Sequence, residues 1–494
     1  MASDNNKNQK GFASNAMTLV GSNIVAQIIT LAFIPIITRI YSPEAFGQFA
    51  SILAIAFLFA SVSSFRYSAA ILLPESENSS DALTLLSMIM VFAFSVGLCV
   101  AVIFFEHEIR NYANLQVGDI SVYLIPFIML LAGIKLIVDA WYLREEAFKA
   151  LAYSHIFEAG SDRISSITLG IVASAGALGL LIGKMTGLLL SIFTLILNGK
   201  SRRLTSIVST SSIRQIIPVA KEYRRFPIFS WSALLQQGTV QLPIIMMGIY
   251  YQPAIVGYLA LARRILLEPA NIIGVAVQKS FHQKIALDYR EGRDIKDSTL
   301  RLLRSMLAYI TIPMMLFSFS AEYLFAIIFG ETWRQSGQYA QVLTPMFIAV
   351  LLVLPFSALF DILHKQKEQG IYNMSVLVVG FITLSLGGVF LDPYYTVVLF
   401  SAGSTLLILS RIVSLMQYAG VTAKEAINAI MEALILTFIA AMPIVVTKYM
   451  FKYDFIVIFI LSIVVFVTYI LYLYKTDIFI ANIASTLFCK KKMK

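Results

Sequence analysis

The chain has 494 residues, of which 58% are hydrophobic and only 13% are charged, and its mean hydropathy is +0.79. A water-soluble globular protein carries about 25% charged residues, so composition excludes that class and indicates a polytopic membrane protein. The net charge of +10 lies in short segments between apolar runs, a pattern of membrane topology that argues against nucleic acid as a partner.

The apolar runs are about 20 residues long, which is the length that an α-helix needs to cross a bilayer. They lack the ten-residue alternation of outer-membrane strands, so we predict an all-α protein. About fourteen transmembrane helices are expected, at residues 15–38, 46–73, 82–105, 120–142, 151–173, 176–197, 227–250, 254–278, 302–329, 338–363, 371–391, 395–417, 427–448 and 455–474. The first run is too long for the core of a signal peptide, and we expect it to be retained as a span.

One short pattern occurs twice in the chain. Ile40–Ala50 aligns with Tyr250–Ala260, 210 residues later, and Tyr, Pro, Gly and Ala coincide. Each copy precedes the second span of its half, which predicts two parallel six-helix lobes with a transport site between them. The lobes are predicted at 1–205 and 206–420, with two additional helices and a basic tail at 421–494. The alternative is that proline and glycine simply recur at helix turns.

The segment between the sixth and seventh spans is strongly basic, and Glu222 is its only acidic residue. Its basic residues are Lys200, Arg202, Arg203, Arg214, Lys221, Arg224 and Arg225. By the positive-inside rule this segment is cytoplasmic, and an even number of spans then places both termini on the same side. Lys448 and Lys452, on the opposite side, are exceptions to this rule.

Three spans before this segment contain charged side chains. Lys135 and Asp139 are four residues apart and either neutralise each other or form a site. Glu158 and Asp162 share a helix face in the same way, either as carriers of a coupling proton or as a surface cluster. Lys184 lies within a stripe of glycines that allows close helix packing, and it is a candidate cavity charge.

The eighth span carries Arg263, Arg264 and Glu268 near its middle. A guanidinium at the centre of a membrane helix costs about 2.5–3.5 kcal/mol even on the mildest insertion scale, so these residues are expected to face the protein interior. Glu268 can share the helix face of Arg264, whereas Arg263 points elsewhere. The arginines either pair with an acid on a neighbouring helix or line an anion-binding cavity.

Enzyme and metal signatures are missing from the chain. The four histidines lie in separate segments without metal-ligand spacing, and the two cysteines form no cluster. The pair Gly183-Lys184 lacks the first glycine and the hydroxyl residue of a nucleotide-binding P-loop. We therefore expect no enzyme activity, no metal and no cofactor.

The run Ala262–Ala276 resembles the eighth span of flippases in the multidrug/oligosaccharidyl-lipid/polysaccharide (MOP) exporter superfamily. In those proteins an arginine precedes a proline by five residues and a Gly-x-Ala follows. The matching residues here are Arg264, Pro269, Gly274 and Ala276. Arg39–Gly47, followed by Phe65–Pro74, resembles the opening of O-antigen and capsule repeat-unit flippases in the polysaccharide transporter group.

The resemblance implies a fold like that of multidrug exporters and a flippase in the bacterial cytoplasmic (inner) membrane. Such a protein moves an undecaprenyl-diphosphate-linked oligosaccharide by alternating access, for lipopolysaccharide O-antigen, capsule or another surface polysaccharide. It is coupled to protons, sodium or the membrane potential, and a polysaccharide polymerase and chain-length machinery are its expected partners. The candidate substrate-binding residues are Arg264, Arg263, Arg66, Lys184 and Lys135. The candidates for coupling or charge pairing are Glu268, Asp139, Glu158 and Asp162.

Other functions remain open. A peptidoglycan-precursor flippase shares the arginine at Arg264 and suits fourteen spans, while a cation-coupled multidrug exporter would favour an acidic cavity. A membrane glycan polymerase or ligase would present a long extracytoplasmic loop, and none is expected here.

Overall fold

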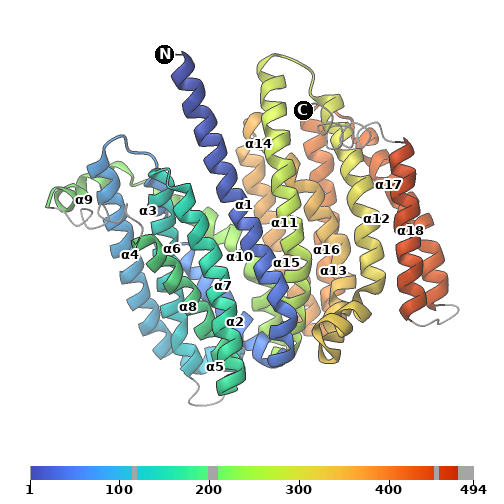
Figure 1. Cartoon of the computed structure of the whole chain (residues 1–494), viewed down its shortest axis with the longest axis horizontal. Coiled ribbons are helices and arrows are strands. Elements are labelled where there is room, and N and C mark those ends of the chain that lie inside the picture. The colour runs from blue at the N-terminus through green and yellow to red at the C-terminus, as the bar shows by residue number, and fades with distance from the viewer. Residues whose placement is uncertain (1, 114–119, 198–209, 450–454, 477–494) are drawn as a thin grey trace, which may run out of the picture. The chain divides into compact units, whose positions relative to one another are not determined.

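Figure 1 shows the computed structural model of the chain, which describes residues 2–113, 120–197, 210–449 and 455–476. Within these ranges every regular element is a helix, which confirms the all-α fold class. The N-terminal elements are α1 (Ala2–Ile40), α2 (Pro43–Ala60), α3 (Tyr67–Ala70), α4 (Glu77–Phe104), α5 (Glu106–Ala113), η1 (Ile120–Tyr123), α6 (Leu124–Arg144), α7 (Phe148–Ala173), α8 (Gly176–Leu197) and α9 (Thr210–Glu222). The others are α10 (Phe226–Tyr250), α11 (Pro253–Arg290), α12 (Lys296–Phe329), η4 (Glu331–Trp333), α13 (Arg334–Phe356), α14 (Ala358–Ile362), α15 (Gln366–Phe390), α16 (Pro393–Tyr418), α17 (Ala423–Tyr449) and α18 (Phe455–Thr476).

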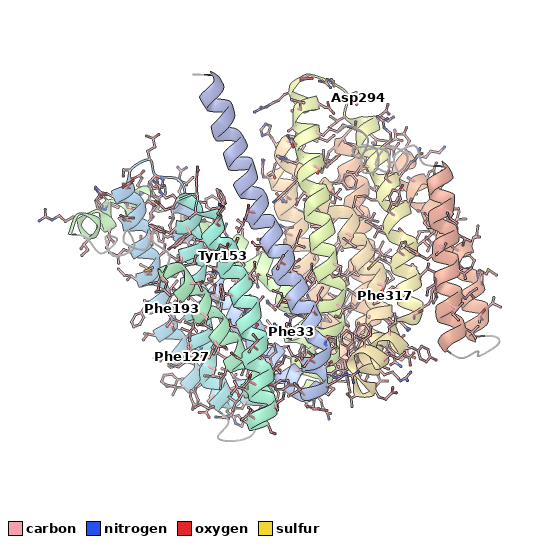
Figure 2. All side chains as sticks on the ribbon, viewed as in Figure 1. Phe33, Phe127, Tyr153, Phe193, Asp294 and Phe317 are labelled. Carbon is pink, nitrogen blue, oxygen red and sulfur yellow. The ribbon has the colours of Figure 1, made fainter. Side chains whose placement is uncertain are left out.

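Each of the fourteen predicted spans overlaps one of the long helices. In the described ranges, ten helices are long and apolar enough to cross a membrane by length and composition. Large apolar side chains face outward from them, as Phe127 on α6 and Phe193 on α8 illustrate, each 52% exposed (Figure 2). Extended apolar surface of this kind suits contact with lipid, and the chain is a multi-pass membrane protein. Lys200, Arg202 and Arg203 and the basic C-terminal tail lie outside the described residues.

The second predicted span, 46–73, is too long. Helix α2 ends at Ala60, and the hydroxyls of Ser61 and Ser63 donate hydrogen bonds to the carbonyls of Leu58 and Ala60. Such local bonds compete with the helical ladder, and the run of serines therefore favours a turn. Arg66 lies in this turn, with φ of 62°, and not within a span as the sequence suggested.

The chain divides into two compact units. The first comprises Met1–Glu268, Ile328–Trp333 and Gly370–Phe400, and the second comprises Pro269–Ile327, Arg334–Gln369 and Ser401–Lys494. The division falls inside α11, between Glu268 and Pro269, and inside α16 after Phe400. The lobes predicted at 1–205, 206–420 and 421–494 follow the sequence repeat and stay a prediction.

The two copies of the sequence pattern meet in the first unit. Pro43 begins α2 and Pro253 begins α11, and each helix has its glycine four residues later. A Cβ on Gly47 would overlap the carbonyl oxygen of Pro253, and a Cβ on Gly257 would overlap that of Pro43. Because each glycine contacts the proline of the other copy, the crossing is reciprocal, as in a two-fold symmetric interface.

The tyrosines of the two copies also occupy similar places. Tyr41 donates a hydrogen bond of 2.6 Å to the carbonyl of Ser166 on α7, and its ring lies against Gly179 on α8. Tyr251 lies 2.6 Å from Thr396 on α16, and its hydroxyl is 3.2 Å from the carbonyl of Gly387 on α15. Each tyrosine thus joins one helical hairpin, α7 with α8 or α15 with α16, to the turn that carries the pattern.

Trp333 of η4 is fully buried where α2 and α11 cross. Its indole donates a hydrogen bond of 2.8 Å to the carbonyl of Thr38. Its ring makes edge contacts with Phe46 of α2 and Tyr258 of α11, at centroid distances of 5.5 and 6.1 Å. The tryptophan therefore fixes this end of both repeats.

The second unit contains the last two helices. Helix α17 packs on α18, and Ile312 and Leu316 of α12 form a small apolar core with Ile444 of α17. The hydroxyl of Tyr469 on α18 donates to the carbonyl of Ala308 on α12, at 2.9 Å. The Arg411 guanidinium lies over the ring of Phe360, 4.6 Å from its centroid.

Candidate functional site

Close packing of α7 on α8 brings the predicted charges of the first unit together. A Cβ on Gly183 would overlap the Ser166 hydroxyl, and one on Gly187 would lie 2.9 Å from the Cβ of Asp162. The glycine stripe predicted around Lys184 thus lets α8 approach the backbone of α7. The consequence is that charged groups from the two helices meet within the bundle.

Lys184 and Glu158 form an ion pair across this interface. The lysine Nζ lies 2.7 Å from the Glu158 carboxylate, and both side chains are largely buried. The same Nζ lies over the ring of Phe57 on α2, 5.8 Å from the centroid. Such a contact between an ammonium group and an aromatic face is attractive and helps to hold the lysine side chain in this position.

Lys135 and Asp139 also pair, within α6. The lysine Nζ is 2.5 Å and 2.6 Å from the two carboxylate oxygens, so the pair is locally neutral. His155 of α7 lies beside it, with Nε2 at 3.6 Å from Asp139 and Nδ1 at 2.6 Å from the amide oxygen of Asn23 on α1. Of the two interpretations of Lys135 and Asp139, the geometry favours mutual neutralisation.

Asp162 and Arg163 are the most deeply buried members of the cluster, 3% and 4% exposed. They form an ion pair of 3.0 Å, and Ser166 lies 3.4 Å from the second carboxylate oxygen of Asp162. The Arg163 Nε is buried and has no hydrogen-bond partner in the part of the chain that the structure describes. Glu158 and Asp162, predicted to act as one carboxylate pair, each have a separate cationic partner.

Arg264 of α11 lies within electrostatic range of Arg163, Asp162 and Glu268. Its Nε is buried without a hydrogen-bond partner, and among the described residues no carboxylate lies within ion-pairing distance of it. Two guanidinium groups from different helices therefore present unused N–H donors in one region. Buried guanidinium N–H groups of this kind can donate hydrogen bonds to the oxygens of an anion.

Arg263 also has a buried Nε without a hydrogen-bond partner among the described residues, but its other contacts differ from those of its neighbour. Its Nη2 donates a hydrogen bond of 2.8 Å to the carbonyl of Val240 on α10. This contact ties α11 to α10, so Arg263 has a structural use that Arg264 lacks. Of the two adjacent arginines, Arg264 is the one near the charges of α7.

The structure thus brings together Arg264, Glu268, Asp162, Glu158 and Lys184, and it places Lys135 and Asp139 next to them. Arg66 stands apart, because no contact of its side chain links it to this cluster in the described residues. Sequence reasoning did not assign roles to Arg163 or His155. The sequence offered one signal for these two residues: Arg163 lies within one helical turn of Asp162, and His155 lies within one helical turn of Glu158.

No group of three or more potential metal ligands occurs among the described residues.

Comparison with known proteins places this arrangement in context. Residues 36–338 match the model of a family described as polysaccharide biosynthesis protein. The fold is similar to the lipid II flippase MurJ in an inward closed conformation, with 13% identity, a TM-score of 0.67 and coverage of 94% of this chain and 99% of that one. It is also similar to an inward-facing multidrug resistance MATE family transporter of the MOP superfamily, with 12% identity, a TM-score of 0.52 and coverage of 81% and 95%. No curated protein matches the chain.

Proposed function

This chain belongs to the polysaccharide biosynthesis protein family, and we propose that it is a flippase for an undecaprenyl-diphosphate-linked oligosaccharide. The family match and the fold shared with MurJ and MATE transporters support the predicted membership of the MOP superfamily. The proposed cargo is a lipid-linked repeat unit, which the protein would deliver to the outer leaflet for the synthesis of O-antigen, capsule or another surface polysaccharide. A polymerase and chain-length machinery would then consume it.

The observation that carries this proposal is the pair of buried arginines, Arg163 and Arg264. A diphosphate is a multivalent anion, and the planar guanidinium group binds phosphate oxygens through two parallel hydrogen bonds. The Nε of each arginine has no hydrogen-bond acceptor among the described residues. A diphosphate bound between them would accept these bonds and would offset the repulsion of two like charges.

The proposed cycle is alternating access in the bacterial cytoplasmic membrane, with both termini in the cytoplasm. The charged head would cross along the polar cluster of α6, α7, α8 and α11, while the lipid tail stays in the bilayer. The small space between α12, α17 and α18, about 170 Å³, is lined mainly by apolar side chains, with Arg304 and Glu432 also in its lining, and would accommodate part of that tail. Glu268, Asp139, Glu158 and Asp162 are the proposed charge partners during the cycle, which a proton, sodium or the membrane potential would drive.

Deleting the gene in its own host tests the proposal. Complete lipid-linked repeat units should accumulate in the extracted membrane lipids while surface polysaccharide is lost. If peptidoglycan precursor accumulates instead, the substrate is the one named for the MurJ neighbour. If neither lipid accumulates and the cells become sensitive to cationic drugs, the multidrug exporter alternative replaces the proposal. If complete repeat units reach the surface unpolymerised, the protein acts as a polymerase or ligase.

A further inference from the structure

A pocket of the first unit lies at the turn between α10 and α11, and its lining includes none of the charged residues described above. Its volume is about 600 Å³, within the usual range of about 300–1,000 Å³ for small-molecule sites. Its polar lining comes from the end of α5, with Asn111 and Tyr112, and from the turn, with Tyr250, Tyr251 and Gln252. All of these residues belong to the first unit, so the pocket is complete within it.

The lining has a distinctive chemistry. Among the described residues it consists of three phenols and two carboxamides, with Gly248, Ile249, Ile255 and Pro393, and none of these side chains is charged. A diphosphate would require cations, and a hydrocarbon tail would require an apolar surface. A neutral sugar ring offers hydroxyls to the carboxamides and an apolar face to the aromatic rings, so a sugar matches this lining better than either.

The aromatic rings are held in place by the fold. The hydroxyl of Tyr251 forms a hydrogen bond of 2.6 Å with the Thr396 hydroxyl and donates one of 2.8 Å to the carbonyl of Leu391. The ring of Tyr250 packs where a Cβ on Gly388 would lie. These contacts fix both rings and leave the pocket with a preformed aromatic wall, which lowers the entropic cost of binding.

Tyr112 supplies the donor of the pocket. Its ring occupies the space that a side chain at Gly248 would need, 2.7 Å from the position that a Cβ would take there. Its hydroxyl is buried and lies beside the side chain of Ser51. A ligand hydroxyl in the pocket would give this group a further hydrogen bond.

The pocket also has a defined position relative to Arg264. The turn that lines it leads into Pro253, the first residue of α11, and Arg264 follows eleven residues later, about 16 Å along the helix. A short oligosaccharide attached to a diphosphate at Arg264 reaches across this distance. On the predicted topology this turn is extracytoplasmic, because it lies one span beyond the basic segment.

We propose that this pocket is a sugar-binding subsite, which holds neutral sugar rings of the oligosaccharide at the extracytoplasmic end of the first unit. The proposal rests on the proposed flippase function, since that function supplies the diphosphate anchor. It adds a recognition site for the glycan itself, formed by Tyr112 and Gln252 with the aromatic wall.

Binding of free oligosaccharides to the full-length protein in nanodiscs tests the proposal. The probes are oligosaccharide fragments of the host's surface polysaccharides, prepared by partial acid hydrolysis, and saturation-transfer NMR measures binding. The variants Tyr112→Phe and Gln252→Ala should each bind about three- to tenfold more weakly, because each loses a hydrogen bond. Tyr153→Phe is the matched control, since Tyr153 lies on α7 away from the pocket and is 63% exposed (Figure 2).

Inorganic pyrophosphate added to the same samples separates the two sites. It should not displace the fragments, because it would bind at the arginines. Absence of fragment binding to the wild-type protein, or equal binding to the wild type and a Tyr112→Phe, Gln252→Ala double variant, would overturn the subsite. The gene-deletion experiment reports on the flippase function independently, so the two failures are distinguishable.

Discussion

At the scale of single residues, the charged side chains of the first unit differ in what neutralises them. Lys135 and Lys184 each have a carboxylate within 2.7 Å, and Arg263 has a backbone carbonyl. Arg264 has neither within bonding distance among the described residues, and only the field of Asp162 and Glu268 balances its charge. This difference makes Arg264 the residue most sensitive to the presence of an anionic ligand.

Replacing Arg264 by alanine is expected to abolish transport while the protein still folds, because no protein partner loses a hydrogen bond. Arg264→Lys keeps the charge but loses the planar fork, and we expect transport to fall about tenfold or more, as for a lost bond to a charged group. Surface polysaccharide in a complemented deletion strain gives the readout. Arg263→Ala is the control, since it should lower thermal stability through Val240 and retain transport. Wild-type export by a stably expressed Arg264→Ala protein would refute the anchor role.

Glu106 on α5 provides a prediction about pH. The Tyr123 hydroxyl donates to its carboxylate at 2.7 Å and Arg110 pairs with it at 2.6 Å, and together they hold the pKa of Glu106 below its usual value of 4.5. A group whose pKa is lowered by folding stabilises the protein above its unfolded pKa, and this stability is lost as the pH falls through the folded value. Glu106→Gln should therefore unfold at a lower temperature than the wild type at pH 7, with the difference shrinking below about pH 4.

Thermal unfolding in detergent across this pH range gives the measurement. Glu108→Gln on the same helix serves as the control, because Glu108 is exposed and no ion pair of its side chain occurs in the described residues. A difference for Glu106→Gln that stays constant from pH 7 to well below pH 4 would contradict this account.

At the scale of elements, the crossing of α2 and α11 is the closest contact between the two sequence repeats. Gly47 and Gly257 leave room for the carbonyls of Pro253 and Pro43, and Trp333 packs beside them. Only a residue without a Cβ permits this approach of two backbones.

Gly47→Val is expected to force the beginnings of α2 and α11 apart by about 2 Å or more, since carbon atoms pack at about 3.5–4 Å. Spin labels at positions 44 and 252, in a protein without its native cysteines, would report this as a longer distance. The control is Gly97→Val on α4, where no atom lies within 4 Å of the place that a Cβ would occupy. An unchanged distance distribution for Gly47→Val would show that the contact tolerates a side chain.

The elements also show how far sequence reasoning reaches. The spans were predictable because a membrane helix must satisfy its own backbone hydrogen bonds over about 20 apolar residues, which is a local requirement. The end of α2 was missed because hydroxyls of Ser61 and Ser63 compete with the helix, a weak local signal inside an apolar run. The repeat was visible in the shared Tyr, Pro and Gly, but the reciprocal contact of Gly47 and Gly257 required the fold.

The candidate site was predictable only in part. Arg264, Lys184 and Asp162 could be found from the sequence, because each is a charged residue inside an apolar run. Charge in a membrane helix is rare, since burying it in the bilayer costs free energy. Which partner each one faces depends on packing between helices. For that reason the sequence did not reveal that Arg163 lies near Arg264. It also placed Arg66 within a span, whereas the structure places Arg66 in a turn.

At the scale of the whole molecule, the boundary between the two compact units falls at Pro269, in the helix that carries Arg264. A proline inside a helix removes one backbone hydrogen bond and favours a bend there. Arg264, the proposed anion-binding residue, thus lies five residues before this boundary along the chain.

Reconstituted transport is the most direct test of the central claim. Purified full-length protein would be placed in liposomes that contain the undecaprenyl-diphosphate-linked oligosaccharide extracted from the deletion strain, and a glycan-cleaving enzyme added outside would measure how fast the inner-leaflet pool becomes accessible. We predict that the wild-type protein exposes this pool well above the rate of protein-free liposomes, and that Arg264→Ala does not. Equal rates for wild-type and protein-free liposomes, with and without an imposed ion gradient or membrane potential, would contradict the flippase function.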